Sequence, residues 1–142
     1  MTYNNLPSYT YTIYTIDELE NLVIFADEVL SEKDIPLEIN SIIHLVIDEI
    51  ALNVVEHGFS NVPTKNGLLT TIVFNPNEIV LSFEDDGIPF NPIQHNVDLQ
   101  MDKPLLDHNL GGLGIHIVRH YADDIEYEYV NGKNILVFHK RW

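Results

Sequence analysis

Hydrophobic and polar residues alternate in several short runs along the chain, and in other segments apolar residues recur every three or four positions. Alternation with a period of two is typical of β-strands, whereas spacing of three and four is typical of amphipathic helices. The alternating runs are rich in β-branched and aromatic residues, which favour strands. The predicted strands are Ser8–Tyr14, Leu68–Phe74, Glu78–Glu84, Ile125–Val130 and Asn134–His139.

Three segments have the helical pattern. The first, which Thr15 or Asp17 can cap, carries its apolar residues between Leu19 and Leu30. The second is predicted over Leu37–His57, and its apolar residues lie nearly all the way round the helix, which indicates that it is largely buried. The third is a short helix over Ile115–Tyr121 that follows a glycine-rich run.

The order of these elements predicts the fold class. Asn131-Gly132 is a hairpin signal between the last two strands, and Asn75-Pro76-Asn77 is a turn between the second and third. A chain of 142 residues is long enough to bury a core, and we expect one domain over residues 1–142. The prediction is an α/β two-layer sandwich, in which about three helices cover one face of a mixed, mostly antiparallel sheet.

Composition and charge narrow the classes of function. The chain has 22 acidic residues against 7 Lys and Arg, a net charge of −15, so it lacks the cations needed to neutralise nucleic-acid phosphates. There is no cysteine, which excludes disulfides, zinc thiolates and a cysteine nucleophile. No apolar run is long enough to span a membrane, and no secretory signal is present. We therefore expect a cytoplasmic protein that binds neither nucleic acid nor membrane.

Three polar clusters carry candidate chemistry, and the first lies on the buried helix. Glu49, Asn53 and His57 are spaced four residues apart, which places them on one stripe. Polar groups on so apolar a helix are costly to bury without partners, so the stripe is expected to line a wet cleft. The alternative is that these side chains cap or bridge neighbouring elements, and the cluster alone leaves both open.

The second cluster, Asp85-Asp86-Gly87, directly follows a predicted strand. An ionised carboxylate only accepts hydrogen bonds, so it can receive one from an exocyclic amine, and glycine lets a ring approach the backbone. A tight acidic turn is the alternative.

The third cluster, Gly111–Ile115, precedes a helix, and free N–H groups at a helix start form an anion site. Taken alone it is a weak signal, since glycine-rich turns are common.

Together the three clusters resemble the GHKL superfamily of ATPases and kinases, which share the Bergerat nucleotide-binding fold. The segments that carry the resemblance are Ile47–His57, Asp85–Pro92, Gly111–Ile115 and the ending Gly132–Val137. Their order along the chain is far more specific than any one of them. Within the superfamily, the two sequence motifs Ile-Pro-Phe-Asn-Pro and Gly-Gly-Leu-Gly-Ile are similar to those of the single-domain branch, the anti-sigma-factor serine kinases.

The resemblance implies a role for each matching residue. Asn53 would give its side-chain oxygen to Mg²⁺, and Glu49 would be the general base. Asp85 would accept a hydrogen bond from the adenine amine, with Gly87 giving the ring room; the family spacing favours Asp85 over Asp86, which we expect to be a solvated side chain. The residues expected to hold the phosphates through backbone N–H groups are Gly112, Leu113 and Gly114.

The function implied is an Mg-ATP-dependent serine protein kinase that phosphorylates an anti-sigma-antagonist protein and binds a sigma factor. A homodimer joined through the Tyr9–Tyr14 strand is also implied. Between Ile93 and Leu110, where the family has a lid, Lys103 is the only Lys or Arg, and we assign it to the terminal phosphate. So few cations leave two alternatives open: a non-catalytic module switched by nucleotide, and a hydrolytic ATPase of the same fold.

Overall fold

The computed structural model describes residues 5–60, 63–94 and 110–142, and in the last range the side chains are described from Gly114 onward. The strands are β1 (Ser8–Ile13), β2 (Leu68–Asn75), β3 (Glu78–Asp85), β4 (Asp124–Val130) and β5 (Lys133–Arg141). The helices are the 3₁₀ turn η1 (Ile16–Glu18), α1 (Leu19–Ser31), α2 (Leu37–Asn53), the π-helical turn η2 (Val54–Gly58) and α3 (Leu110–Tyr121).

The strands form one five-stranded sheet in the order β1-β2-β3-β5-β4. Every neighbouring pair of described strands is antiparallel. The sheet is therefore antiparallel throughout the described residues, whereas a mixed, mostly antiparallel sheet was predicted. Each predicted strand is present, with ends within two residues of the expected positions. In the β4–β5 hairpin, Asn131 and Gly132 both have positive φ, 54° and 77°, as a type I′ turn requires.

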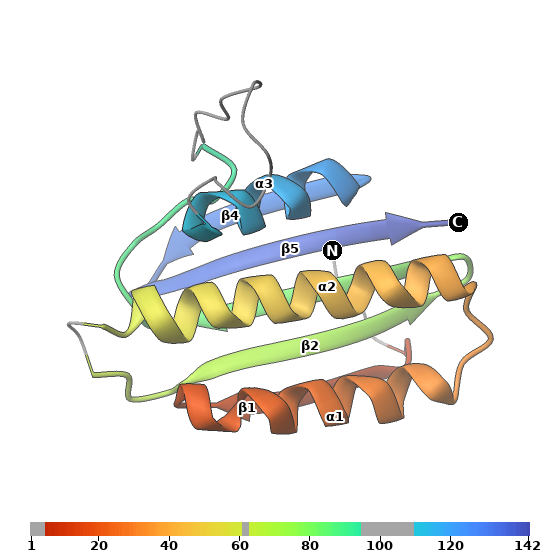
Figure 1. Cartoon of the computed structure of the whole chain (residues 1–142), viewed down its shortest axis with the longest axis horizontal. Coiled ribbons are helices and arrows are strands. Elements are labelled where there is room, and N and C mark those ends of the chain that lie inside the picture. The colour runs from red at the N-terminus through yellow and green to blue at the C-terminus, as the bar shows by residue number, and fades with distance from the viewer. Residues whose placement is uncertain (1–4, 61–62, 95–109) are drawn as a thin grey trace.

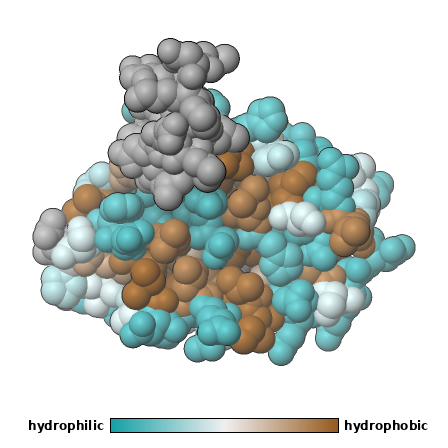
Figure 2. All heavy atoms as spheres, viewed as in Figure 1, coloured by the Kyte–Doolittle hydropathy of each residue, from teal (hydrophilic) through white to brown (hydrophobic). Residues whose placement is uncertain are grey.

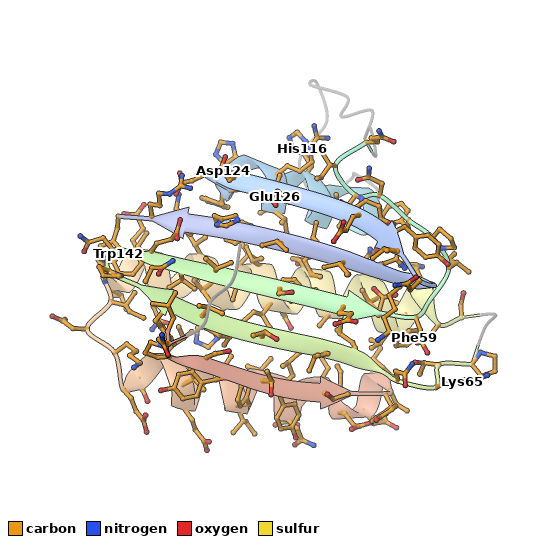
Figure 3. The ribbon with its side chains drawn as sticks, turned by 180° about the vertical axis from the view of Figure 1, so that it is seen from behind. Phe59, Lys65, His116, Asp124, Glu126 and Trp142 are labelled. Atoms are coloured by element: carbon orange, nitrogen blue, oxygen red, sulfur yellow. The ribbon has the colours of Figure 1, made fainter. Side chains whose placement is uncertain are left out.

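The three α-helices lie on one face of the sheet, with α2 between α1 and α3 (Figure 1). Seen from behind, the sheet faces the viewer and the helices lie beyond it (Figure 3). The two-layer α/β class is therefore confirmed. The core fills the space between the layers, where the fully buried side chains from both include Leu22, Ile43, Val46, Ile47, Ile72, Leu81, Phe83 and Phe138.

The second predicted helix changes geometry near its end. Regular α2 stops at Asn53, and the chain continues through Gly58 as the wider turn η2, in which the Phe59 amide donates to the Val54 carbonyl at 3.1 Å. A π-helical turn disrupts the regular ladder and is frequent at functional sites. His57 lies within this turn.

The third helix begins at Leu110, five residues before the predicted start at Ile115, so the glycine run is helical. Glycine costs about 1 kcal/mol relative to alanine inside a helix, which is why the pattern placed these residues in a loop. An α-helix leaves its first four N–H groups without partners in the helix. Residues 110–113 occupy these positions.

The outer surface on the helical side mixes hydrophilic and hydrophobic side chains (Figure 2). Its exposed apolar residues include Ile24, at 49% exposure, and Leu37, at 80%. No helix in the described ranges has both the length and the apolar character to cross a membrane.

Candidate functional site

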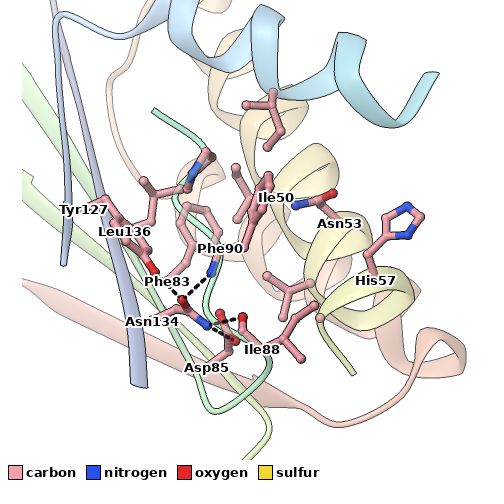
Figure 4. A pocket seen from close by; sticks show the side chains of 14 residues that line it. Ile50, Asn53, His57, Phe83, Asp85, Ile88, Phe90, Tyr127, Asn134 and Leu136 are labelled. Carbon is pink, nitrogen blue, oxygen red and sulfur yellow. Dashed lines mark hydrogen bonds between the residues drawn. The ribbon is translucent and has the colours of Figure 1, made fainter. Parts of the chain in front are cut away.

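A cavity of about 320 Å³ lies where the end of α2 and the turn η2 face the end of β3 and the start of β5. Figure 4 shows Asn53 and His57 on its helical wall, across from Asp85 and Asn134 on the sheet wall. Most of the lining is apolar. The lining residues are Ile50, Asn53, Val54, His57, Gly58, Phe83, Asp85, Ile88, Phe90, Pro92, Ile115, Tyr127, Asn134 and Leu136.

Asp85 is a buried carboxylate in this apolar cavity, with 7% of its surface exposed. Its Oδ1 accepts hydrogen bonds from the Gly87 amide at 2.9 Å and from Asn134 Nδ2 at 3.1 Å. Burial raises the pKa of Asp85, and the Asp86 charge adds to this, whereas the two hydrogen bonds oppose it. Among the described residues, no hydrogen bond reaches Oδ2, so one oxygen is available to a ligand.

Asn134 lies directly opposite Asp85 in the β3–β5 register and was not among the predicted site residues. It is 6% exposed, and besides Asp85 its amide contacts the loop after β3. The sequence did carry a signal for Asn134. The alternation along this strand places Asn134 on the same inward face as Leu136 and Phe138, where a polar side chain is unusual. Periodicity alone did not say which strand it would face.

Gly87 and Ile88 dock onto the end of η2. The Ile88 amide donates to the Gly58 carbonyl at 3.2 Å, and a Cβ added at Gly87 would lie 2.6 Å from that same oxygen. Only glycine therefore permits this approach of the loop to the helix end. The contact ties the loop that carries Asp85 to the turn that follows Asn53.

Asn53 and Glu49, one helical turn apart on α2, are both half-buried. Asn53 lines the cavity, whereas Glu49 does not and instead packs against α3. Burial raises the pKa of Glu49, and the charge of Asp48 raises it further. The predicted stripe thus reaches the cavity through Asn53 and His57, and Glu49 lies beside it.

Gly114 is buried against Glu49, since a Cβ built on it would lie 2.1 Å from Glu49 Oε2. This is a different contact from the backbone–phosphate contact expected for Gly114. Gly112 is among the residues whose N–H groups have no partner within the helix, and the phosphate contacts expected for Gly112 and Leu113 stay predictions. Lys103 lies outside the described residues.

Asp86 was expected to be solvated, and the structure corrects this. Its carboxylate accepts hydrogen bonds from the Thr64 hydroxyl, from the Lys65 amide at 2.9 Å and from the Asn66 amide at 3.1 Å. Burial alone would raise the pKa of Asp86, but these hydrogen bonds outweigh it and lower the pKa. Asp86 holds the segment before β2, which local sequence could not reveal because its partners lie about twenty residues earlier.

The comparison with known families decides what kind of domain this is. The family model described as histidine kinase-like ATPase domain matches residues 14–140, nearly the whole chain. The chain belongs to the histidine kinase-like ATPase domain family. The match covers both walls of the cavity, and the ATPase domain is accordingly a nucleotide-binding domain, as the resemblance to the GHKL superfamily predicted.

The ATPase domain also has a solved structural neighbour, described as the RsbU and RsbW domains of Rv1364c from Mycobacterium tuberculosis. The TM-score is 0.67 at 16% sequence identity, and the alignment covers 95% of this chain and 32% of that one. The ATPase domain thus spans about a third of the length of its neighbour, and the likeness shows a shared fold. Among curated proteins, no sequence gives a significant match.

The cavity of the ATPase domain suits a nucleotide. Its apolar walls fit the faces of a planar base, and Asp85 offers an acceptor to the edge of the base. The first turn of α3 carries amides that have no partner within the helix, together with the positive end of the helix dipole, and both suit phosphates. The side-chain oxygen of Asn53 in the cavity wall is a hard donor of the kind that Mg²⁺ takes while it keeps several waters. The residues present therefore fit both a nucleotide and Mg²⁺.

Proposed function

We propose that the chain is an Mg-ATP-dependent serine protein kinase of the anti-sigma-factor type, which phosphorylates an anti-sigma-antagonist protein and binds a sigma factor. One observation carries the proposal: Asn53 from the end of α2 and Asp85 from the end of β3 share the wall of one cavity. The sequences of the segments Asp85–Pro92 and Gly111–Ile115 favour the anti-sigma-factor branch of the superfamily. The fold shared with the RsbU and RsbW domains is compatible with it.

In this proposal the sheet wall binds the base and the helical wall serves the phosphates. Asp85 accepts a hydrogen bond from the adenine amine, and the amides at the start of α3, including those of Gly112 and Leu113, hold phosphate oxygens. Asn53 donates an oxygen ligand to Mg²⁺. When bound, Mg²⁺ offsets the negative charge that develops on the phosphoryl group during transfer.

Glu49 acts on the protein substrate. The serine oxygen forms a bond to the γ-phosphorus, the bond from that phosphorus to the bridging oxygen of ADP breaks, and the hydroxyl proton passes to the Glu49 carboxylate. A general base is most effective when its pKa approaches the working pH, and burial raises the pKa of Glu49 in that direction.

The decisive experiment follows labelled γ-phosphate from ATP in the presence of Mg²⁺ and an anti-sigma-antagonist protein. We expect label on serine, and we expect Glu49→Gln to lower the transfer rate by about 100-fold or more with ATP affinity nearly unchanged. Asp48→Asn is the matched control: it removes a neighbouring exposed charge and leaves the Glu49 carboxylate in place, so the transfer rate should fall only slightly, through the smaller of the two causes that raise the pKa of Glu49.

The same experiment separates the alternatives. Release of free phosphate without a protein acceptor would identify a hydrolytic ATPase in which Glu49 activates water. Tight ATP binding with neither transfer nor release would identify a non-catalytic module, in which nucleotide changes the affinity for a partner. The specific observation that favours the module is the stretch between Ile93 and Leu110, whose only Lys or Arg is Lys103.

A further inference from the structure

We propose that Asn134 is a positioning residue for nucleotide binding: it holds the loop after β3 against the sheet and sets the direction in which Asp85 presents its free oxygen. The inference rests on the proposed function, because it concerns the same cavity. It adds a residue that neither the motifs nor the family match assigns, and its role is exerted through Asp85 and the loop.

Asn134 uses both ends of its side-chain amide. Nδ2 donates to Asp85 Oδ1 at 3.1 Å and to the Ile88 carbonyl at 3.0 Å, with the Gly87 carbonyl at 3.4 Å. Oδ1 accepts from the Phe90 amide at 3.1 Å and from the Tyr127 hydroxyl. Figure 4 shows the amide between Asp85 and the backbone of the loop.

These contacts join segments that have no regular pairing. The loop from Gly87 to Phe90 leaves the sheet after β3, and both Ile88 and Phe90 line the cavity. The Gly87 amide on Asp85 and the Ile88 amide on Gly58 also hold the loop. Without the Asn134 amide, two carbonyls and the Phe90 N–H of the loop would lose this partner, so the loop would be held less firmly against the sheet.

The same amide fixes the Asp85 carboxylate. Oδ1 is occupied by two donors, so the rotation of the carboxylate is set, and Oδ2 is left for a ligand. A donor bonded to the ionised form also opposes the protonation that burial favours. Loss of this donor should therefore both loosen the carboxylate and make it protonate at higher pH.

The first test needs no nucleotide. In Asn134→Leu, which has similar size and no polar atoms, amide hydrogen exchange at Phe90 should become about tenfold faster or more, and carbon NMR should show Asp85 protonating at higher pH. Ile135→Ala is the matched control, because it weakens β5 from the opposite face and should leave both readouts unchanged. Parent-like exchange and titration in Asn134→Leu would overturn the inference.

The second test measures ATP affinity against pH. Asn134→Leu should bind ATP about tenfold more weakly at neutral pH, a loss of about 1.4 kcal/mol, and its affinity should fall off at higher pH than in the parent. Tyr127→Phe removes the hydroxyl that bonds to Asn134 Oδ1 but keeps the Asn134 amide, so affinity should fall about threefold at most, and the pH at which affinity falls off should not move. Asp86, beside Asp85, and His57, in the cavity wall, are retained in every variant, and the titratable Tyr127 of the same wall is replaced only in Tyr127→Phe.

The outcomes distinguish the two proposals. If the parent does not bind ATP, the proposed function fails, and the exchange and carboxyl titration still decide the role of Asn134. If the parent binds ATP and Asn134→Leu binds equally well with the same pH profile, the positioning role is wrong while nucleotide binding stands. If Asn134→Leu does not fold, an unmoved loop and unaltered affinity in Tyr127→Phe and Asn134→Ser would overturn the inference.

Discussion

Asp85 and Asp86 are consecutive carboxylates whose pKa values are moved in opposite directions by the fold. Asp85 points into an apolar cavity, where burial favours its neutral form. Asp86 points to the segment before β2, where three donors favour its ionised form. Two adjacent residues of the same type therefore differ in surroundings: one faces the cavity, where we propose that it binds the base, and the other stabilises the chain.

Replacing Asp85 separates binding from stability. A raised folded-state pKa contributes stability at low pH that is lost as the pH rises through that pKa, so ionised Asp85 costs stability at pH 7. Asp85→Asn removes this cost and the acceptor charge. We expect a higher melting temperature without nucleotide and no further increase with Mg-ATP, both measured by thermal unfolding at pH 7. An undiminished ATP effect would show that Asp85 does not bind the base.

Asp86→Asn should behave in the opposite way. A lowered folded-state pKa contributes stability above the ordinary Asp value that is lost as the pH falls through the folded pKa. The variant should lose about 1 kcal/mol at pH 7 and keep the increase in melting temperature caused by ATP. Loss of the ATP effect here, with retention in Asp85→Asn, would reverse the assignment of the two carboxylates.

At the scale of elements, α2 and α3 meet where Gly114 packs on the Glu49 carboxylate. The pattern of apolar residues predicted both helices, but it started α3 at Ile115 because glycines favour loops. The structure places this glycine inside the helix, where the missing side chain makes room for a carboxylate from another helix. Local propensity could not anticipate that, because the reason lies in a contact between elements.

Gly114→Ala tests this contact. The new methyl group would collide with the flexible end of Glu49, so the carboxylate should rotate away at little cost in stability. We expect phosphoryl transfer to fall by about 100-fold, since a general base displaced by about 1 Å loses its alignment, with ATP affinity nearly unchanged. Kinetic and binding measurements on the same preparation check this.

Gly132→Ala is the matched control in the β4–β5 hairpin. Gly132 has a φ of 77° and open space around it, so alanine there is strained but touches nothing. The variant should be less stable by about 1 kcal/mol and transfer phosphate at the parent rate. Equal losses of transfer in Gly114→Ala and Gly132→Ala would indicate a general effect of destabilisation.

At the scale of the whole molecule, the cavity is bounded by both layers. Ile50 and Ile115 reach it from α2 and α3, and Phe83 and Leu136 reach it from β3 and β5. A ligand there contacts the helical layer and the sheet together. Nucleotide binding should therefore stabilise the fold as a unit.

Mg-ATP at about 100 times its dissociation constant should add about 2.7 kcal/mol to the free energy of unfolding. For a chain of this length that corresponds to an increase in melting temperature of roughly 10 °C. GTP at the same concentration should produce a much smaller increase, because its base presents a carbonyl oxygen to the Asp85 carboxylate. An equal increase with GTP would contradict base recognition by Asp85.

The sequence by itself determined the elements and the two-layer class, and it led to the prediction that Asn53 and Asp85 bind a nucleotide. Strand and helix periodicity, hairpin signals such as Asn131-Gly132, and the ordered motifs around Asn53 and Asp85 are local features, and local features can be read without knowing which strands pair.

Only the tertiary structure decided what those residues touch. The sheet order inserts β5 between β3 and β4, and this alone brings Asn134 opposite Asp85. The partners of Asp86 and the packing of Gly114 on Glu49 likewise join segments far apart in the chain. Such contacts depend on strand register and helix packing, which arise from burial of the whole core and leave no periodic trace in the sequence.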